Sequence, residues 1–289
     1  MPIHPDWYWN KVVINLPSYG RATTKLPKML KSAFETVSDP NNIELVLIHN
    51  PIKDPDTISV ANQLCGEYGV VLTSVVENMA RPHLSLYFNM AYKQQDQDPR
   101  RAQGYYGDDM LFCTPGWDER VLWAIAKKEG IGVFYCAGDD RFGDALCVNM
   151  VLTRKFVRMC SNWFMCPKFP ANGSDMVWQL AADATNLDMY IDDVVILHEQ
   201  CSRAHLGWDE TYHRLFPARR QAIRDKMYEK SYAQKLVQRL NVHGFGDGRK
   251  AVHNLHRVRP GRHYISMENG ERIVQGDGNL KVVDEVVHG

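Results

Sequence analysis

Long apolar runs are missing from this chain of 289 residues, and none approaches the roughly 20 residues that a membrane-spanning helix needs. The N-terminal stretch MPIHPDWYWNK also lacks the basic and then apolar pattern of a signal peptide. We therefore expect a globular protein with no transmembrane segment, located in the cytoplasm.

Cysteine motifs are missing as well. The seven cysteines are scattered, no Cys-x-x-Cys spacing occurs, and Cys160 and Cys166 form the closest pair. This pattern favours reduced, mostly buried thiols over disulfides or a zinc site.

A net charge is also absent, because 34 Lys and Arg balance 34 Asp and Glu. The charges are unevenly distributed: residues 1–213 carry 19 basic and 26 acidic side chains, whereas residues 214–263 carry 13 and 3. An acidic body with a basic arm predicts an anionic partner near the arm. The alternative is a solvated basic helix that neutralises the acidic body.

The sequence does contain an alternation of apolar strands and amphipathic helices, which is typical of a mostly parallel sheet covered by helices. In the first half, strands are expected at 11–16, 43–48 and 70–76, and helices at 25–37, 56–68 and 82–92. A fourth strand is expected to begin at Tyr105, after the polar loop QQDQDPRR. In the second half, strands are expected at 132–136, 147–153 and 190–198, and helices at 118–128, 155–162 and from a Ser174 cap to about 184.

The stretch GYYGDDMLFCTPGWDE, residues 104–119, places Asp108 and Asp109 side by side after two aromatic residues. Two adjacent carboxylates repel one another, so a fold that keeps both usually gives them a cation or hydrogen-bond donors. The alternative is a solvated turn, where Asp is a common residue.

The order of these motifs resembles the GT-A glycosyltransferases, and most of all the small family 2-like members of bacteria and bacteriophages. The resemblance covers about residues 11–213 and rests on VVINLPSYGR, Glu77-Asn78, Asn89, GDDM with TPGWDE, Asp175 and a strand ending in His198. It implies a Rossmann-like, mixed and mostly parallel sheet flanked by helices, and the activity of a hexosyl- or pentosyltransferase. If the chain is phage-encoded, the expected cytoplasm is that of the host cell.

In this family the donor substrate, a nucleotide-diphosphate sugar, lies across the carboxyl ends of the first strands. By resemblance, the residues that line the nucleotide are Pro17, Ser18, Tyr19, Arg21 and Asn50. Ordinary turn and packing roles are the alternative for Pro17 and Tyr19. The family's acidic residue after the second strand is missing, so the sequence does not specify the nucleotide.

Asp108 and Asp109 match the last two positions of the family's Asp-x-Asp motif, whose first position here is Gly107. The match implies that Asp108 binds the ribose or a metal-bound water and that Asp109 ligates Mn²⁺ or Mg²⁺. His198 matches a histidine that often supplies another ligand, and its imidazole favours Mn²⁺. A hydrogen-bonded core histidine is the alternative.

The resemblance also implies that Asp175 is the base, which takes a proton from the acceptor hydroxyl in an inverting transfer. Helix capping explains this residue equally well. One of Asp139, Asp140 or Asp144 could be the base instead. Asp139, Asp140 and Trp117 are further candidates for contact with the donor sugar or the acceptor, although Trp117 would also serve to cover the next helix.

Residues 1–213 are thus expected to form the catalytic domain and residues 214–289 a C-terminal extension outside the resemblance. The extension is expected to contain a basic helix at about 217–240 and a small β-hairpin at 264–275 that turns at Asn269-Gly270.

The basic arm, with Arg219, Arg220 and Arg224, suits phosphate contacts with a DNA acceptor that carries hydroxymethylated pyrimidines. A cell-surface glycan or a lipid-linked acceptor is the alternative. A non-catalytic relative that binds nucleotide or nucleic acid is a third possibility. The oligomeric state is not specified.

Overall fold

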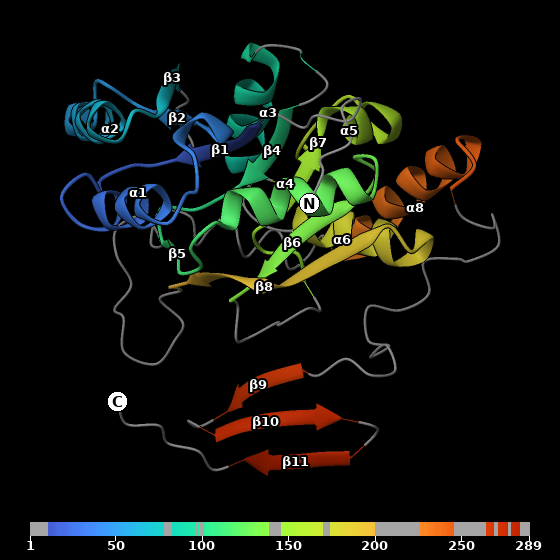
Figure 1. The fold of residues 1–289 in the computed structure, drawn as a ribbon. Helices are drawn as coiled ribbons and strands as arrows, with labels where there is room; N and C mark the ends of the chain where they lie inside the picture. Colours follow the sequence, from blue (N-terminus) through green and yellow to red (C-terminus); the bar gives the residue numbers. More distant parts are fainter. Residues whose placement is uncertain are drawn as a thin grey trace.

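A computed structural model of the protein shows one mixed eight-stranded sheet with helices on both faces (Figure 1). The structure describes residues 11–77, 83–95, 98, 101–138, 146–169, 174–199, 226–245, 264–268, 271–276 and 279–283.

The strand order in the sheet is β3-β2-β1-β4-β7-β6-β8-β5. The strands are β1 Lys11–Pro17, β2 Ile43–His49, β3 Val71–Val76, β4 Arg101–Tyr105, β5 Met110–Phe112, β6 Val133–Ala137, β7 Val151–Thr153 and β8 Asp188–His198. Strands β3, β2, β1 and β4 run parallel, as do β6 and β8, whereas β7 and β5 are antiparallel to their neighbours. The expectation of a mixed, mostly parallel sheet is confirmed.

Two apolar clusters cover the two faces of this sheet. Strand β1 shows why, because Val12, Ile14 and Leu16 join one cluster and Val13 joins the other, as the alternation of side chains along a strand requires. The first cluster packs against α1 Lys25–Glu35, α2 Pro55–Tyr68 and α4 Trp117–Lys127. The second packs against α3 Leu84–Gln94, α5 Arg154–Cys160, α6 Ser174–Thr185 and α8 Lys226–Val242.

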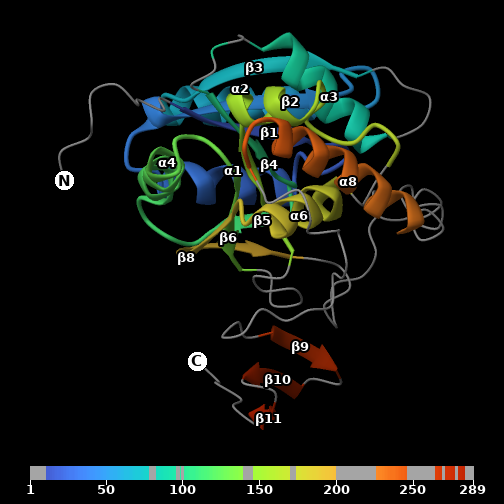
Figure 2. The same cartoon turned by 90° about the vertical axis from the view of Figure 1, so that its right-hand side faces the viewer.

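Helix α8 is the part of the expected basic helix that the structure describes. Ala233, Leu236, Val237 and Leu240 are buried in the second cluster, and the helix lies beside α6 (Figure 2). Helix α8 therefore shares a core with the body. Within the described part of the chain, no helix is long and apolar enough to cross a membrane.

A separate three-stranded antiparallel sheet follows, made of β9 Tyr264–Glu268, β10 Glu271–Gly276 and β11 Asn279–Val283. Glu268 pairs with Glu271, which confirms the expected hairpin. Strand β11 was not expected.

Three expectations about local structure are wrong. The fourth strand begins at Arg101 rather than Tyr105, and its polar Gln103 is accommodated because its side-chain oxygen accepts a hydrogen bond from Asn15 Nδ2 (3.2 Å). Residues 147–150 form a turn before β7, in which Asn149 Oδ1 accepts from the Cys136 N–H at 2.8 Å. Ser174 is the first residue of α6 rather than its cap.

The expectation for the cysteines is supported wherever the structure describes them. The six described cysteines are free, and all except Cys113 are buried. Burial raises the pKa of Cys65 to about 12 and that of Cys166 to about 11, so these thiols stay protonated at neutral pH.

Candidate functional site

The turn after β1 is fixed by backbone contacts at the carboxyl edge of the sheet. The Ser18 N–H donates to the Ile48 carbonyl at 3.1 Å, and the Gly20 N–H donates to the carboxylate of Asp54. Gly20 has a φ of 69°, a left-handed conformation that glycine adopts without strain. Asp54 also accepts from the Thr57 hydroxyl. Sequence reasoning missed Asp54, although an Asp directly before Pro55 and a helix is a recognisable signal.

Asn50, expected to line the nucleotide, organises the loop after β2. Its Oδ1 accepts from the N–H groups of Ile52 (3.2 Å) and Lys53 (3.0 Å), and its Nδ2 donates to Glu77 Oε1 at 3.5 Å. Asn50 and Glu77 are both buried. A carboxylate therefore reaches this edge from the end of β3, although the usual acidic residue after β2 is missing.

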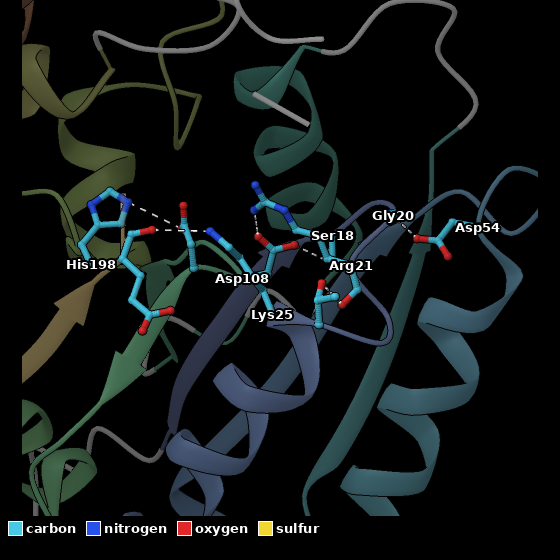
Figure 3. A network of polar contacts seen from close by, with 10 residues as sticks. Ser18, Gly20, Arg21, Lys25, Asp54, Asp108 and His198 are labelled. Atoms are coloured by element: carbon cyan, nitrogen blue, oxygen red, sulfur yellow. Dashed lines mark hydrogen bonds and ion pairs between the residues drawn. The ribbon is translucent and has the colours of Figure 1, made fainter. Parts of the chain in front are cut away.

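Asp108 is held from two sides by residues of the first turn (Figure 3). Ser18 Oγ donates to one carboxylate oxygen at 2.8 Å, and the Arg21 guanidinium forms an ion pair with the other. Only 5% of Asp108 is exposed. Burial raises the pKa of Asp108 to about 6, while the charge of Arg21 and the Ser18 hydrogen bond act in the opposite direction.

Asp109 and His198 are brought together by strand pairing. Strands β5 and β8 are antiparallel with Met110 opposite His198, and the N–H of Glu199 donates to the Asp109 carbonyl at 2.7 Å. His198 Nε2 then lies 3.5 Å from Asp109 Oδ1, near the Asp108 group (Figure 3). Two residues 89 positions apart in the sequence thus form one polar pair.

This pair fits a divalent cation. A carboxylate oxygen and an imidazole nitrogen 3.5 Å apart can both reach one ion, since metal bonds to such atoms are about 2.0–2.2 Å long. Among the described residues, no group of three or more His, Cys, Asp and Glu side chains converges on one point. The protein would then supply two donors and leave positions for the diphosphate and water, as is usual when a cation serves phosphate chemistry.

Two lysines of α1 lie at the same edge and were missed by sequence reasoning. Lys25 Nζ approaches the Glu199 carbonyl oxygen at 3.5 Å, and Lys28 pairs with the Glu199 carboxylate at 2.6 Å. Lys25 belongs to the polar network around Asp108 and His198 (Figure 3). The edge therefore carries positive charge from α1 as well as from Arg21.

Trp117 does not face this edge. It is fully buried, its Nε1 donates to the Ala33 carbonyl at 3.1 Å, and its ring packs 4.5 Å from that of Phe112. Of the two roles expected for Trp117, packing is supported and contact with a sugar is not, because a ring enclosed in the core has no face left for a ligand. Pro17 and Tyr19 are half-buried in the turn after β1.

Asp175 occupies the first turn of α6, as expected, and is half-buried. Its carboxylate accepts from the Met176 N–H at 2.9 Å, and its carbonyl oxygen is 3.3 Å from Cys147 Sγ. Its assignment as the base stays a prediction.

Several candidate residues lie outside the described part of the chain, namely Asp139, Asp140, Asp144, Arg219, Arg220 and Arg224. The carbonyl of Gly138, the last described residue before Asp139, accepts from the His198 N–H at 3.3 Å.

Neither the protein-family models nor the curated proteins give a match to this sequence. Solved structures do. The mannosyltransferase PcManGT from Pyrobaculum calidifontis, in complex with GDP-Man and Mn²⁺, aligns with a TM-score of 0.53 and 15% identity, over 82% of this chain and 76% of that one. TarS of S. aureus aligns with a TM-score of 0.52 and 11% identity, over 94% of this chain and 60% of TarS. Glucosyl-3-phosphoglycerate synthase from Mycobacterium tuberculosis, with Mn²⁺, UDP and glucosyl-3-phosphoglycerate, aligns with a TM-score of 0.50 and 12% identity, over 79% and 86%.

The chain has the GT-A fold. In this GT-A sheet, the Ser18, Arg21 and Asp108 group and the Asp109–His198 pair lie at one edge, where loops follow the strands. Open α/β sheets bind ligands at the carboxyl ends of their strands, so this edge is the candidate active site.

Proposed function

We propose that this protein is a metal-dependent glycosyltransferase, which moves a sugar from a nucleotide-diphosphate sugar to an acceptor hydroxyl with inversion. One observation carries the proposal: in a GT-A sheet, buried Asp108 is fixed by Ser18 and Arg21 while adjacent Asp109 faces His198 at 3.5 Å. Two neighbouring carboxylates with such different partners suit a donor site better than a solvated turn.

Asp109 and His198 would hold Mn²⁺, or Mg²⁺ in its place. When bound, the cation neutralises the diphosphate and stabilises the departing nucleotide. Two of the structural neighbours contain Mn²⁺ together with a nucleotide or nucleotide sugar, which supports this choice.

Binding of the donor substrate would use the turn after β1. Asp108 already accepts two protein hydrogen bonds, but a carboxylate has about four acceptor positions, which leaves room for a ribose hydroxyl. Pro17, Tyr19 and Asn50 would line the nucleotide. Arg21 would add positive charge near the phosphates.

Asp175 would act as the base. Its carboxylate takes the proton of the acceptor hydroxyl while that oxygen attacks the anomeric carbon. The bond from this carbon to the diphosphate oxygen breaks, and its electron pair leaves with the nucleotide diphosphate. Asp175 lies in the first turn of α6, where the partial positive charge of a helix N-terminus attracts a carboxylate. Asp139, Asp140 and Asp144 are the other candidates.

The donor is tested by incubating the protein with Mn²⁺ and a panel of nucleotide sugars, with plain and with hydroxymethylated DNA, and measuring free nucleotide diphosphate. We expect release with one donor, loss of release with a chelator and recovery when Mn²⁺ is added back. Binding of a nucleotide sugar without release under any condition would favour a non-catalytic binding protein.

For the acceptor we propose hydroxymethylated pyrimidines of DNA, reached by residues 214–289 while residues 1–213 carry the chemistry. The support is the charge of residues 214–263, which have 13 Lys and Arg against 3 Asp and Glu. Such an arm would bind phosphates and make affinity fall with salt. A cell-surface glycan or a lipid-linked acceptor would need no such contact with DNA.

Retention on duplex DNA tests this acceptor. Replacing Arg219, Arg220 and Arg224 with Gln should weaken retention and lower the salt dependence by about one unit of slope for each lost phosphate contact. The control replaces three cations at α4, Arg120, Lys127 and Lys128, with Gln, so that the charge change is the same. Equal retention of both triple variants would overturn the DNA proposal.

A further inference from the structure

Two polar side chains of α3 are buried and take no part in the contacts described above. Ser85 is 2% exposed and Asn89 is 6% exposed. They are four residues apart on the helix and therefore share one face. Buried polar side chains are normally retained with hydrogen-bond partners, so their partners indicate what they do.

The partners of Asn89 are backbone groups of the segment 161–169, which links α5 toward α6. Asn89 Oδ1 accepts from the N–H groups of Phe164 (2.8 Å) and Met165 (2.9 Å), and its Nδ2 donates to the Met165 carbonyl at 2.6 Å. Irregular backbone inside a protein needs such partners, because it has no helix or strand to supply them. One amide side chain thus fixes two consecutive residues of the segment.

The segment in turn holds the start of α6 through direct contacts. The Trp178 Nε1–H donates to the Phe164 carbonyl at 2.8 Å, and Ser174 Oγ donates to the Cys166 carbonyl at 3.4 Å. Ser85 Oγ donates to the Phe169 carbonyl and lies 3.2 Å from Ser174 Oγ. Ser174 is the residue before Asp175.

Helix α8 contacts both ends of this region. Arg239 Nη1 donates at 3.1 Å to the carbonyl of Cys160, the last residue of α5, and the ring of Tyr232 meets that of Phe169 edge to face at 6.0 Å. Figure 2 shows α8 beside α6. The segment before α6 is therefore held by α3 and α8 together.

We propose that Asn89, assisted by Ser85, is a positioning residue for Asp175. Asn89 fixes the segment 161–169, and this segment together with Ser85 fixes Ser174 and the first turn of α6. The carboxylate of Asp175 is thereby held in one place relative to the acceptor hydroxyl. The inference rests on the proposed function, because it assigns Asp175 the role of base.

Asn89→Ala should lower kcat by about 10- to 100-fold, because displacing a reacting group by about 1 Å has effects of this size. KM for the nucleotide sugar should stay within about twofold, since ground-state donor binding does not involve α6. Asn89→Asp keeps the acceptor for both N–H groups but places a carboxylate oxygen against the Met165 carbonyl, so its kcat should lie between those of Asn89→Ala and the wild type. Asn42→Ala, which removes one amide hydrogen bond, to Asp118 at 2.8 Å, where Asn89→Ala removes three, is the control and should leave kcat unchanged.

A double-mutant cycle separates positioning from general loss of stability. In an Asp175→Asn background, Asn89→Ala should lower kcat by less than about twofold, because its effect passes through the missing carboxylate. Hydrogen exchange should show faster exchange at residues 174–177 in Asn89→Ala than in Asn42→Ala.

The outcomes distinguish the inference from the proposed function. If the wild type releases no nucleotide diphosphate from any donor, the proposed function fails and the inference fails with it. If the wild type is active but Asp175→Asn keeps full kcat, the inference alone is overturned. The same holds if Asn89→Ala leaves kcat unchanged, or if it lowers kcat equally with and without Asp175.

Discussion

The carboxyl edge of the sheet and the segment before α6 are built in different ways. At the carboxyl edge, charged residues hold one another: Arg21 holds Asp108, and His198 faces Asp109. In the segment before α6, neutral side chains hold the backbone, and Asn89 makes three of these hydrogen bonds. A pair of charges can be found from a motif, whereas the neutral groups that hold the backbone near Asp175, the proposed base, leave no motif in the sequence.

The largest effect is expected for Asp109→Asn. We expect release of nucleotide diphosphate to fall by about 1,000-fold or more, because the substitution weakens one of the two described side chains that are proposed to hold the cation. The measurement is release with Mn²⁺ at saturating donor. Asp193→Asn, which alters an exposed pair with Arg120, is the control. Full activity of Asp109→Asn would remove this residue from the metal site.

The pH dependence of stability tests the burial of Asp108. Its pKa is raised from 3.8 to about 6, so between about pH 4 and pH 6 the folded state binds more protons than the unfolded state. The contribution of Asp108 to the free energy of unfolding therefore decreases as the pH rises through this window. Relative to wild type, the Tm of Asp108→Asn should increase from pH 4 to pH 7 in thermal unfolding.

The exposed Asp192 provides the control for this experiment, as Asp192→Asn. Its Tm difference from wild type should vary less with pH than that of Asp108→Asn. A constant difference for Asp108→Asn would mean that Arg21 and Ser18 fully offset the effect of burial.

A smaller effect is expected for Trp117→Phe. The variant leaves the buried carbonyl of Ala33 without its indole donor and should lower the free energy of unfolding by about 1–3 kcal/mol. KM for the nucleotide sugar should not change. Urea unfolding and donor kinetics check both expectations. Unchanged stability with a raised KM would restore the sugar-contact role.

The smallest effect is expected for Lys28→Ala. Its ion pair with Glu199 is short, but 57% of the Lys28 side chain is exposed. Pairs of this kind contribute about 0–1 kcal/mol, so neither Tm nor the release rate should change appreciably. A loss of release comparable to that of Asp109→Asn would show that α1 supplies an essential charge.

Much of the fold could be predicted from sequence because buried parallel strands and amphipathic helices have simple periodicities. The start of β4 could not be predicted in this way. Its polar residues Arg101 and Gln103 are typical of a loop, and their partners Glu44 and Asn15 lie on other strands. The short strand β5 was missed because three residues are too few to show the alternation of apolar and polar side chains that marks a strand.

For the candidate site, the two adjacent carboxylates pointed to Asp108 and Asp109, and the resemblance to GT-A glycosyltransferases added His198. The sequence could not show that Ser18 and Arg21 bond to Asp108, because this depends on how β1 and β4 pair. Both roles were open for Trp117, because an aromatic residue after a turn looks the same in sequence whether it faces a ligand or the core, and the structure supports packing. Asp54 and Glu77 act through contacts that only the folded chain reveals.

Gly138 has a consequence for how this protein tolerates mutation. Its φ is 121°, and a Cβ built there would lie 2.4 Å from the carbonyl oxygen of Ile196. Its own carbonyl binds the N–H of His198. In a library of random codons, position 138 should therefore reject every replacement, alanine included, although it has no side chain with which to bind or react.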